Sequence, residues 1–438
     1  MASTIQVSSS PSGLCPPLVA NLIAMSPRSV SDHLAAVVEH ALPRSPISLD
    51  LSKAHGLVLA SDAQASLPVP PFSNSAMDGF LVHTAELVGA GPWSFPVIGD
   101  VPAGASPIEL PDNAAVRIMT GAPVPEPHHQ LRVIPVENTN ITPGPGPLPD
   151  YVTINRVPGE RTHIRSAGEN ISPGQAVMSA GSRIDAGAVA ALISAGVDQV
   201  SVYPLPRVAV ISSGDELVEA GVAPGAGQLP DSNRPMIASL LAELGIKHVT
   251  QFHGDDQTGD FQALLAQVCD THELVITTGG VSVGAFDVVR AATDGKDMWF
   301  GSVAQRPGSP QGLGTWHSTT LMCLPGNPVA AFVSFCLYGP PLLWAMSGST
   351  PQAGLWERPY VVAQLAAGTE LSGPPARTLL SPVRLNYSAA GITATPFHHR
   401  GPGSHLVASL ADTDGIAVLD PGADTSAGDP DIRVLLRP

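Results

Sequence analysis

The sequence is poor in lysine and in positive charge generally. Its 438 residues include 21 Lys and Arg against 37 Asp and Glu, which gives a formal net charge of −16 at pH 7. The lysines are Lys53, Lys247 and Lys296. A surface this negative repels nucleic-acid phosphates and anionic lipid headgroups. We therefore expect neither a nucleic acid nor a membrane as a partner.

Cysteine is also scarce. The four cysteines are Cys15, Cys269, Cys323 and Cys336. They show no CxxC spacing, and three of them lie within apolar runs. This pattern favours buried thiols in a reducing compartment over disulfides or a zinc site. The P-loop lysine motif and the GxGxxG fingerprint do not occur, and the histidines lack the spacing of metal ligands. A nucleotide site of either common type is therefore not expected.

Long apolar runs are few. The most apolar one, residues 329–346, is interrupted by Gly339-Pro340-Pro341. Because proline cannot continue the hydrogen bonds of a helix, we predict a buried helix that stops there rather than a membrane span. Residues 1–25 are rich in Ser, Pro and Ala and lack a basic start followed by a long apolar stretch, which predicts a disordered tail rather than a signal peptide. A soluble cytoplasmic protein is expected.

Glycine and proline, in contrast, are abundant, at 43 and 45 residues. This is typical of turn-rich β structure beside α/β units, and the length predicts several domains. Residues 66–160 contain short β-branched runs between Pro and Gly, which predicts a small β domain. Residues 205–348 alternate strand-like and helix-like stretches, which predicts a parallel sheet with crossover helices. Runs of β type return from residue 349 and predict a final small barrel.

Several loops of the predicted sheet could bind a ligand, since ligands bind beyond the carboxyl ends of parallel strands. "ITTGGVSVGAFD" (276–287) brings a Gly-Gly pair to the end of a strand, and "LPGNPVAAF" (324–332) places Asn327 where it could cap a helix. Such loops expose backbone N–H groups to anions. Each also has a simpler interpretation, as a tight turn or an ordinary helix start.

Two further loops carry acids. "ISSGDELVEAG" places Asp215 and Glu216 just after a buried strand, and "FHGDDQTGD" adds Asp255 and Asp256 at the end of another. Alone, each pair could be solvated surface. Together, acids and bare backbone donors at one sheet edge favour a phosphorylated ligand whose charge is bridged by Mg²⁺.

A set of motifs in the chain closely resembles one family, the MoeA-type molybdopterin molybdenumtransferases, which include the E domains of gephyrin and of its plant counterpart. The motifs are "PPFSNSAMDGF", "VRIMTGAPVP", "VISSGDELVEAG", "PDSNRPMIASLLAELG", "VITTGGVSVGAFD", "QRPGSPQG" and "CLPGNPVAAFVSF". They occur in the family's order between about residues 30 and 438.

The resemblance implies a multidomain α/β and β fold. Its parts are an elongated connecting domain (26–65 and 161–204), an inserted β domain (66–160), a three-layer MogA-like α/β domain (205–348) and a C-terminal β-barrel (349–438). It also implies a homodimer with the active cleft between subunits, and transient contact with the adenylating MogA-type protein. The implied reaction hydrolyses adenylylated molybdopterin, releases AMP and places molybdate on the pterin dithiolene with Mg²⁺.

Site residues follow from the same resemblance. The implied catalytic residues are Asp78, Thr120, Glu216, Asp255 and Asp287, of which Asp78, Asp255 and Asp287 would hold Mg²⁺. The implied ligand-binding residues are Gly279, Gly280, Ser282, Arg306, Pro325, Gly326, Asn327, Ser404 and Asn170.

The chain departs from the family pattern at several of these motifs. An acid is replaced by Asn170, lysines by Ser302, Arg306 and Ser309, an arginine by Pro382, and acids by Ser73 and Ala285. Of the three positions that carry lysines in the family pattern, only Arg306 keeps a positive charge. Since a hydrogen bond to a charged group contributes about 1.5–3 kcal/mol, these losses weaken binding of oxyanions unless arginines compensate. The candidates are Arg165, Arg234 and Arg400.

Three functions therefore stay open. The first is an active molybdenum insertase, and the second is a non-catalytic molybdopterin-binding or scaffold paralogue, which the depleted basic set favours. The third is an enzyme of the same fold that acts on a related oxyanion such as tungstate. The sequence does not choose the oxyanion, because selectivity depends on cavity size and donor placement.

Overall fold

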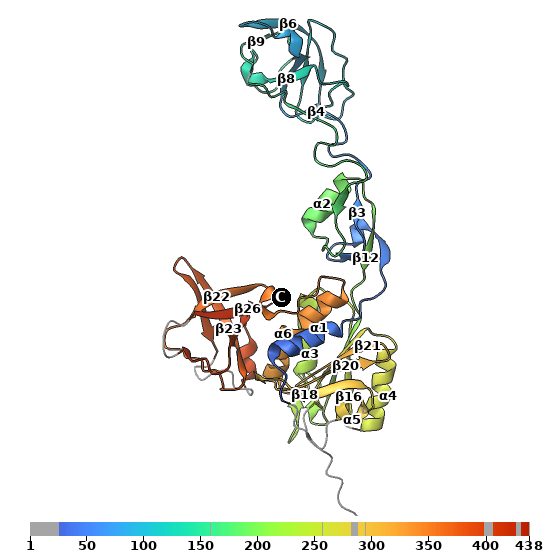
Figure 1. Ribbon diagram of the computed structural model, residues 1–438, viewed down its shortest axis with the longest axis vertical. Helices are drawn as coiled ribbons and strands as arrows, with labels where there is room; N and C mark the ends of the chain where they lie inside the picture. The colour runs from blue at the N-terminus through green and yellow to red at the C-terminus, as the bar shows by residue number, and fades with distance from the viewer. Residues whose placement is uncertain are drawn as a thin grey trace, which may run out of the picture.

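The molecule is elongated, with one small β sheet held far from the rest of the chain (Figure 1). The structure is a computed structural model that describes residues 26–157, 159–255, 257–281, 288–293, 295–397, 406–425 and 431–437. The tail expected over residues 1–25 lies outside this range. In Figure 1 the sheet containing β6, β8 and β9 lies at one end, and the α/β part and the barrel lie at the other.

The α/β part is built on a six-stranded sheet in the order β16-β13-β17-β21-β20-β18. Four strands run parallel, as predicted: β13 (Val208–Ser213), β16 (Val249–Gly254), β17 (Leu274–Thr278) and β21 (Thr319–Leu324). The sheet is mixed, however, because β18 (Asp297–Ser302) and β20 (Pro310–Trp316) are antiparallel. The turn before β21 explains this, since His317 and Ser318 both have positive φ, which suits a two-residue hairpin.

Helices cover both faces of this sheet and give the expected three layers. One face packs against α1 (Val30–Glu39), α3 (Asn233–Glu243) and α6 (Pro328–Met346). The other face packs against α4 (Thr258–Cys269) and α5 (Val288–Ala292). Alternate residues of β13 serve the two cores, Val208 and Val210 facing one and Ala209 and Ile211 the other. The described cysteines are buried free thiols: Cys269, Cys323 and Cys336.

The prediction that the apolar helix stops at Gly339-Pro340-Pro341 was wrong, because α6 continues to Met346. A proline at position 341 leaves the carbonyl of Leu337 without its helical N–H partner. The buried guanidinium of Arg358 replaces that donor, with Nη1 2.9 Å from the Leu337 oxygen. Within the described residues α6 is the one helix long and apolar enough to cross a membrane, yet 94% of that stretch is buried inside the fold.

The distant sheet has the strand order β8-β5-β7-β6-β9. Its strands are β5 (Gly79–His83), β6 (Trp93–Val101), β7 (Ala115–Ile118), β8 (Leu131–Pro135) and β9 (Tyr151–Ile154). Side chains alternate between two small cores, so Leu81 and Val133 pack on one face and Phe80 and Ile134 on the other. A shift of one residue in the pairing of these strands would move each side chain from one core to the other.

An arm of paired short strands carries this sheet. β3 (Ala63–Gln64) pairs with β11 (Ala176–Met178), and β4 (Asn74–Ser75) pairs with β10 (Ile164–Arg165). Nearer the α/β part, β12 (Gln199–Tyr203) lies between β1 (Ile47–Asp50) and β2 (Val58–Leu59), and α2 (Ala186–Ser194) packs beside them. The chain therefore passes through the arm twice.

The C-terminal region forms a closed five-stranded barrel, as predicted. Its strands are β22 (Tyr360–Leu365), β23 (Thr378–Ser388), β24 (Gly391–Pro396), β25 (Gly415–Leu419) and β26 (Asp431–Leu436). Closure comes from the β23–β25 pairing. The short strand β19 (Gln305–Arg306) leaves the α/β part and pairs with β23, which ties the two parts together.

Candidate functional site

The predicted glycine loops meet at the carboxyl edge of the parallel strands. Gly279 and Gly280 follow β17 with φ of 95° and 65°. A methyl group on Gly279 would lie 3.0 Å from the Ser213 carbonyl oxygen, and one on Gly326 would lie 3.3 Å from the Gly279 Cα. The loops after β13, β17 and β21 are therefore in contact, and only residues without a side chain allow so close an approach.

The helix-start interpretation of Asn327 is the one that the structure bears out directly. Its side chain accepts hydrogen bonds from the N–H groups of Val329 at 3.1 Å and Ala330 at 3.3 Å, with Pro328 in the first turn of α6. Pro325, just before it, is buried, whereas Gly326 is exposed. The Gly326 carbonyl accepts a hydrogen bond of 2.6 Å from Asn233.

The acids of this edge that lie within the described residues, Asp215, Glu216 and Asp255, are exposed. Glu216 lies in the loop after β13, where its carbonyl accepts from the N–H of Leu229, and Asp255 directly follows β16, the neighbour of β13. Both can therefore face a ligand over the edge of the sheet. Ser282 and Asp287 lie outside the described residues, so their predicted roles stay predictions.

Sequence reasoning missed a polar network beneath this edge. Buried Asp231 accepts a hydrogen bond of 2.6 Å from the Ser212 hydroxyl. It also forms an ion pair with Arg234, whose Nε lies 3.1 Å from the carboxylate. Arg234 also binds Glu219 at 2.6 Å, so it is not a free replacement for a lost lysine. The stretch "PDSNRP", a polar run directly before an apolar helix, was the signal that could have identified it.

Buried polar atoms without a partner mark the same place. The Asn233 Oδ1 and the hydroxyl oxygen of Thr278 are buried and make no hydrogen bond to any described residue. Buried groups of this kind are rare in folded proteins and are usually satisfied by a ligand or by water. They therefore support a polar ligand at the edge formed by β17, β21 and α3.

Asp78 and Thr120 form a second cluster, on the distant sheet. One carboxylate oxygen of Asp78 accepts from both the backbone N–H and the hydroxyl of Thr120, each at 2.7 Å. These two hydrogen bonds, the backbone one first, lower the pKa of Asp78 from its ordinary value. Asp78 also lines a cavity of about 420 Å³ with Arg117, Met119 and Glu137.

The two clusters lie in different parts of one chain. Asp78 adjoins β5, in the sheet of β6, β8 and β9, whereas Asp255 follows β16, and Figure 1 places these strands at opposite ends of the molecule. In the described part of the chain, no group of three or more His, Cys, Asp and Glu side chains could hold a metal ion. One copy therefore does not assemble the predicted set of Asp78, Asp255 and Asp287 from its described residues.

Comparison with known proteins decides the family. Family models match the MoeA N-terminal region (domain I and II) at residues 28–196, a probable molybdopterin binding domain at 209–344 and the MoeA C-terminal region (domain IV) at 364–430. Molybdopterin molybdenumtransferase 2 of Mycobacterium tuberculosis is 35% identical over 401 residues, which cover 89% of this chain and 94% of that protein. The chain belongs to the MoeA-type molybdopterin molybdenumtransferase family. This confirms the family predicted from the motifs, which is a family of transferase enzymes.

Further relatives agree. Molybdopterin molybdenumtransferase of Staphylococcus aureus is 30% identical over 408 residues, which cover 91% of this chain and 93% of that protein. A crystal structure of the molybdopterin biosynthesis MoeA protein from Pyrococcus horikoshii has a TM-score of 0.74 at 24% identity and covers 94% of this chain and 99% of its own. At that identity the structural likeness supports the fold alone.

The three positions at which the motif resemblance implies lysines carry one exposed arginine. Arg306 lies on β19 at the junction with the barrel, Ser302 is exposed, and the Ser309 hydroxyl donates to the Val303 carbonyl at 2.9 Å. Pro382 lies in β23 opposite Ile416. Of the three positions only Arg306 is charged, so this junction has less positive charge than the resemblance implies.

The remaining predicted residues lie on the arm or outside the described chain. Asn170 is exposed, and its N–H donates to the Val69 carbonyl at 2.9 Å. Arg165, on β10, is also exposed and stays a candidate for compensation. Ser404 and Arg400 lie outside the described residues, as does Ala285.

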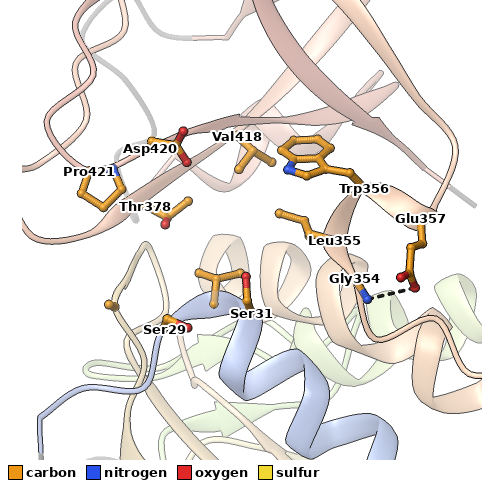
Figure 2. A pocket seen from close by; sticks show the side chains of 12 residues that line it. Ser29, Ser31, Gly354, Leu355, Trp356, Glu357, Thr378, Val418, Asp420 and Pro421 are labelled. Carbon is orange, nitrogen blue, oxygen red and sulfur yellow. Dashed lines mark hydrogen bonds between the residues drawn. The ribbon is translucent and has the colours of Figure 1, made fainter.

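A cavity of about 580 Å³ lies apart from both clusters, between the start of α1 and the barrel (Figure 2). Ser29 and Ser31 line it from α1 and its cap, Trp356 from the short helix before β22, and Val418 and Asp420 from the end of β25. None of the predicted site residues within the described ranges lines it. It is larger than the cavity beside Asp78, but size alone does not indicate a ligand.

Proposed function

We propose that this chain is an active molybdenum insertase of molybdenum cofactor biosynthesis, which hydrolyses adenylylated molybdopterin and transfers molybdate to the pterin dithiolene. The hydrolysis consumes water, breaks a P–O bond of the phosphoanhydride and releases AMP. The observation that carries the proposal is Asp78, an exposed acid whose carboxylate is oriented, and whose pKa is lowered, by two hydrogen bonds from Thr120. An acid fixed in this way is suited to a cation or a water at a phosphate, rather than to a structural role.

The residues present fit Mg²⁺ held mainly by water and phosphate. No described hydrogen bond reaches the second carboxylate oxygen of Asp78, and Asp255 is exposed, so each offers an oxygen ligand. Mg²⁺ retains several waters and needs only one or two carboxylates when the substrate supplies phosphate oxygens. When bound, the ion would neutralise the charge of the phosphoanhydride.

The sheet edge would hold the other part of the substrate. Gly279, Gly280 and Gly326 bring bare backbone close to the ligand, and Glu216 and Asp255 flank it. The dithiolene supplies soft sulfur ligands to molybdenum, so the protein need not provide any. The protein's contribution is to position phosphate, water and oxyanion, which is how most phosphoryl chemistry is catalysed.

A homodimer follows from this proposal, because a single copy keeps Asp78 and the sheet edge at opposite ends of its fold. We propose that the cleft forms between the distant sheet of one copy and the α/β part of its partner. A cytoplasmic location and transient delivery of substrate by an adenylating MogA-type protein are part of the same proposal.

The test is AMP release by the purified chain supplied with adenylylated molybdopterin, Mg²⁺ and molybdate. We expect release that requires both additions. Binding of the substrate without any AMP release would contradict the proposal and would support the scaffold paralogue, which Ser302 and Ser309 favour.

The oxyanion is tested in the same assay. Competition between molybdate and tungstate for insertion would show which of the two the reduced basic run selects. Preferential insertion of tungstate would favour the third function over the first.

A further inference from the structure

Asp78 lies on a ribbon that is fastened at both ends by side chains. Residues 73–78 run antiparallel to residues 120–126, with the Gly121 N–H donating to the Ser75 carbonyl at 2.8 Å and the Val124 N–H to the Ser73 carbonyl at 2.9 Å. Asp78 and Thr120 close one end of this ribbon. At the other end the Ser73 hydroxyl donates to Glu126 Oε1 at 2.5 Å.

The second end continues into a closed ring of hydrogen bonds. Glu126 Oε2 lies 2.8 Å from His128 Nδ1, and His128 Nε2 lies 3.1 Å from the Ser166 hydroxyl. The Ala167 N–H then donates to the Ser73 hydroxyl oxygen at 3.2 Å, which completes the ring. Three chain segments are thereby joined: the start of the Asp78 ribbon, the loop after Thr120 and the loop that leads to Asn170.

The hydrogen bonds of the ring form two branches, and in both the donors can point toward Glu126. His128 donates from Nδ1 to Glu126, so in the neutral imidazole Nε2 accepts from the Ser166 hydroxyl, and Ser73 both accepts from Ala167 and donates to Glu126. Glu126 is the acceptor at which both branches end. Its pKa is lowered, first by the Ser73 hydroxyl and then by His128, which matches an ionised carboxylate.

The order serine, histidine, glutamate resembles a nucleophilic triad, but the surroundings do not support that chemistry. Stabilising an oxyanion requires free N–H donors beside the nucleophile. Here the N–H groups of Ser166, Ala167 and Gly168 donate to Glu169, Ser73 and the Pro70 carbonyl. The ring therefore has no donor left for a substrate oxyanion, and its role must come from the segments that it joins.

We infer that Glu126 and His128 are positioning residues, which hold the Asp78 ribbon against the loop of Asn170 through the Ser73–Glu126–His128–Ser166 ring. This inference rests on the proposed function for the reaction that it serves, but its structural part can be tested alone. Asp78 is exposed and its orientation depends on Thr120, so loosening the far end of the ribbon should also loosen the two hydrogen bonds that orient Asp78.

The first test needs no turnover. Glu126→Gln removes the acceptor for one branch with little change in shape, and Glu109→Gln is the matched control, an exposed acid of the same domain outside the ring. We expect hydrogen exchange of the Gly121 and Val124 amides to be about fivefold faster in Glu126→Gln and unchanged in the control.

The second test uses AMP release. We expect His128→Ala to need about threefold more Mg²⁺ for half-maximal release, with little change in KM for adenylylated molybdopterin, and His128→Asn to recover much of the loss because its amide can still donate to Glu126. Unchanged exchange of both amides in Glu126→Gln would overturn the inference. Faster exchange with normal Mg²⁺ dependence would overturn its functional part. If the wild type releases no AMP, the proposed function fails, while the exchange result still decides whether the ring holds the ribbon.

Discussion

The two clusters of candidate site residues are built in opposite ways. At the sheet edge, strands buried on both faces lead into closely packed loops, where Gly279 and Gly326 matter because they have no side chain. On the distant sheet, Asp78 presents a side chain, which two hydrogen bonds from Thr120 orient. The first surface depends on packing and the second on a few polar contacts. The two ends should therefore respond differently to substitution.

The largest expected effect is at Asp78. Asp78→Ala should reduce AMP release by about 100-fold or more, because a group that contacts the developing charge of a reaction typically contributes that much. Its thermal unfolding temperature should fall only slightly, since Asp78 is exposed and the change removes two hydrogen bonds from Thr120. Asp112→Ala is the control, because Asp112 is 91% exposed and lies in the same domain. Equal losses in both variants would contradict a specific role for Asp78.

A substitution at the sheet edge should affect stability and binding together. Gly279→Ala forces a side chain into a positive-φ position and places a methyl group 3.0 Å from the Ser213 carbonyl oxygen. We expect a loss of about 1–2 kcal/mol in the free energy of unfolding and weaker substrate binding. Gly245→Ala has a similar φ of 81° with no atom within 4 Å, so it should lose stability but bind normally. Calorimetry of unfolding and of binding separates the two.

A substitution at Thr120 tests whether its hydrogen bonds to Asp78 affect activity through the charge of the Asp78 carboxylate. Thr120→Val removes the hydroxyl donor, so the lowered pKa of Asp78 should rise toward its ordinary value. A carboxylate with a lowered pKa stays ionised as the pH falls, and the variant should therefore lose activity at a higher pH on the acid side. Near pH 8 both proteins carry the charged form, and the difference should be smallest. Thr142→Val, in the same cavity, should leave the pH profile of AMP release unchanged.

The smallest expected effect is a gain at the depleted basic run. Ser302→Lys restores one exposed positive charge near Arg306, and an exposed charge pair typically contributes about 0.2–1 kcal/mol. We therefore expect the molybdate concentration for half-maximal turnover to fall by about twofold, and the gain to disappear at high salt. Ser302→Gln adds length without charge and should show no gain. An equal gain in Ser302→Gln would contradict an electrostatic cause.

Local patterns predicted the single elements well, because their causes are local. The alternation of strand-like and helix-like stretches over residues 205–348 predicted the parallel strands of the sheet, such as β13. The motif around Asp78 identified the acid through family resemblance, while its own composition indicated only a turn. The barrel and the three-layer part followed from the same resemblance.

What could not be predicted depends on contacts between distant residues. The apolar helix continues past Pro341 because Arg358, beyond its end, supplies the missing donor, and no pattern within the helix contains that information. The buried Asp231 contacts Ser212 and Arg234, and Arg234 also pairs with Glu219. No pattern in the sequence shows these contacts. The distance between Asp78 and Asp255 is likewise a property of the arm, not of either motif.

Because the chain passes through the arm twice, the distant sheet is an insertion between the two strands of the arm. The Ala65 N–H donates to the Gln175 carbonyl at 2.8 Å, and the Gly174 N–H donates back to the Ala65 carbonyl at the same distance. More than a hundred residues thus leave and return at one point, which a short turn could close. By its topology the acid-bearing sheet is therefore an insertion in the arm, and its strands take no part in the sheet of the α/β part or in the barrel.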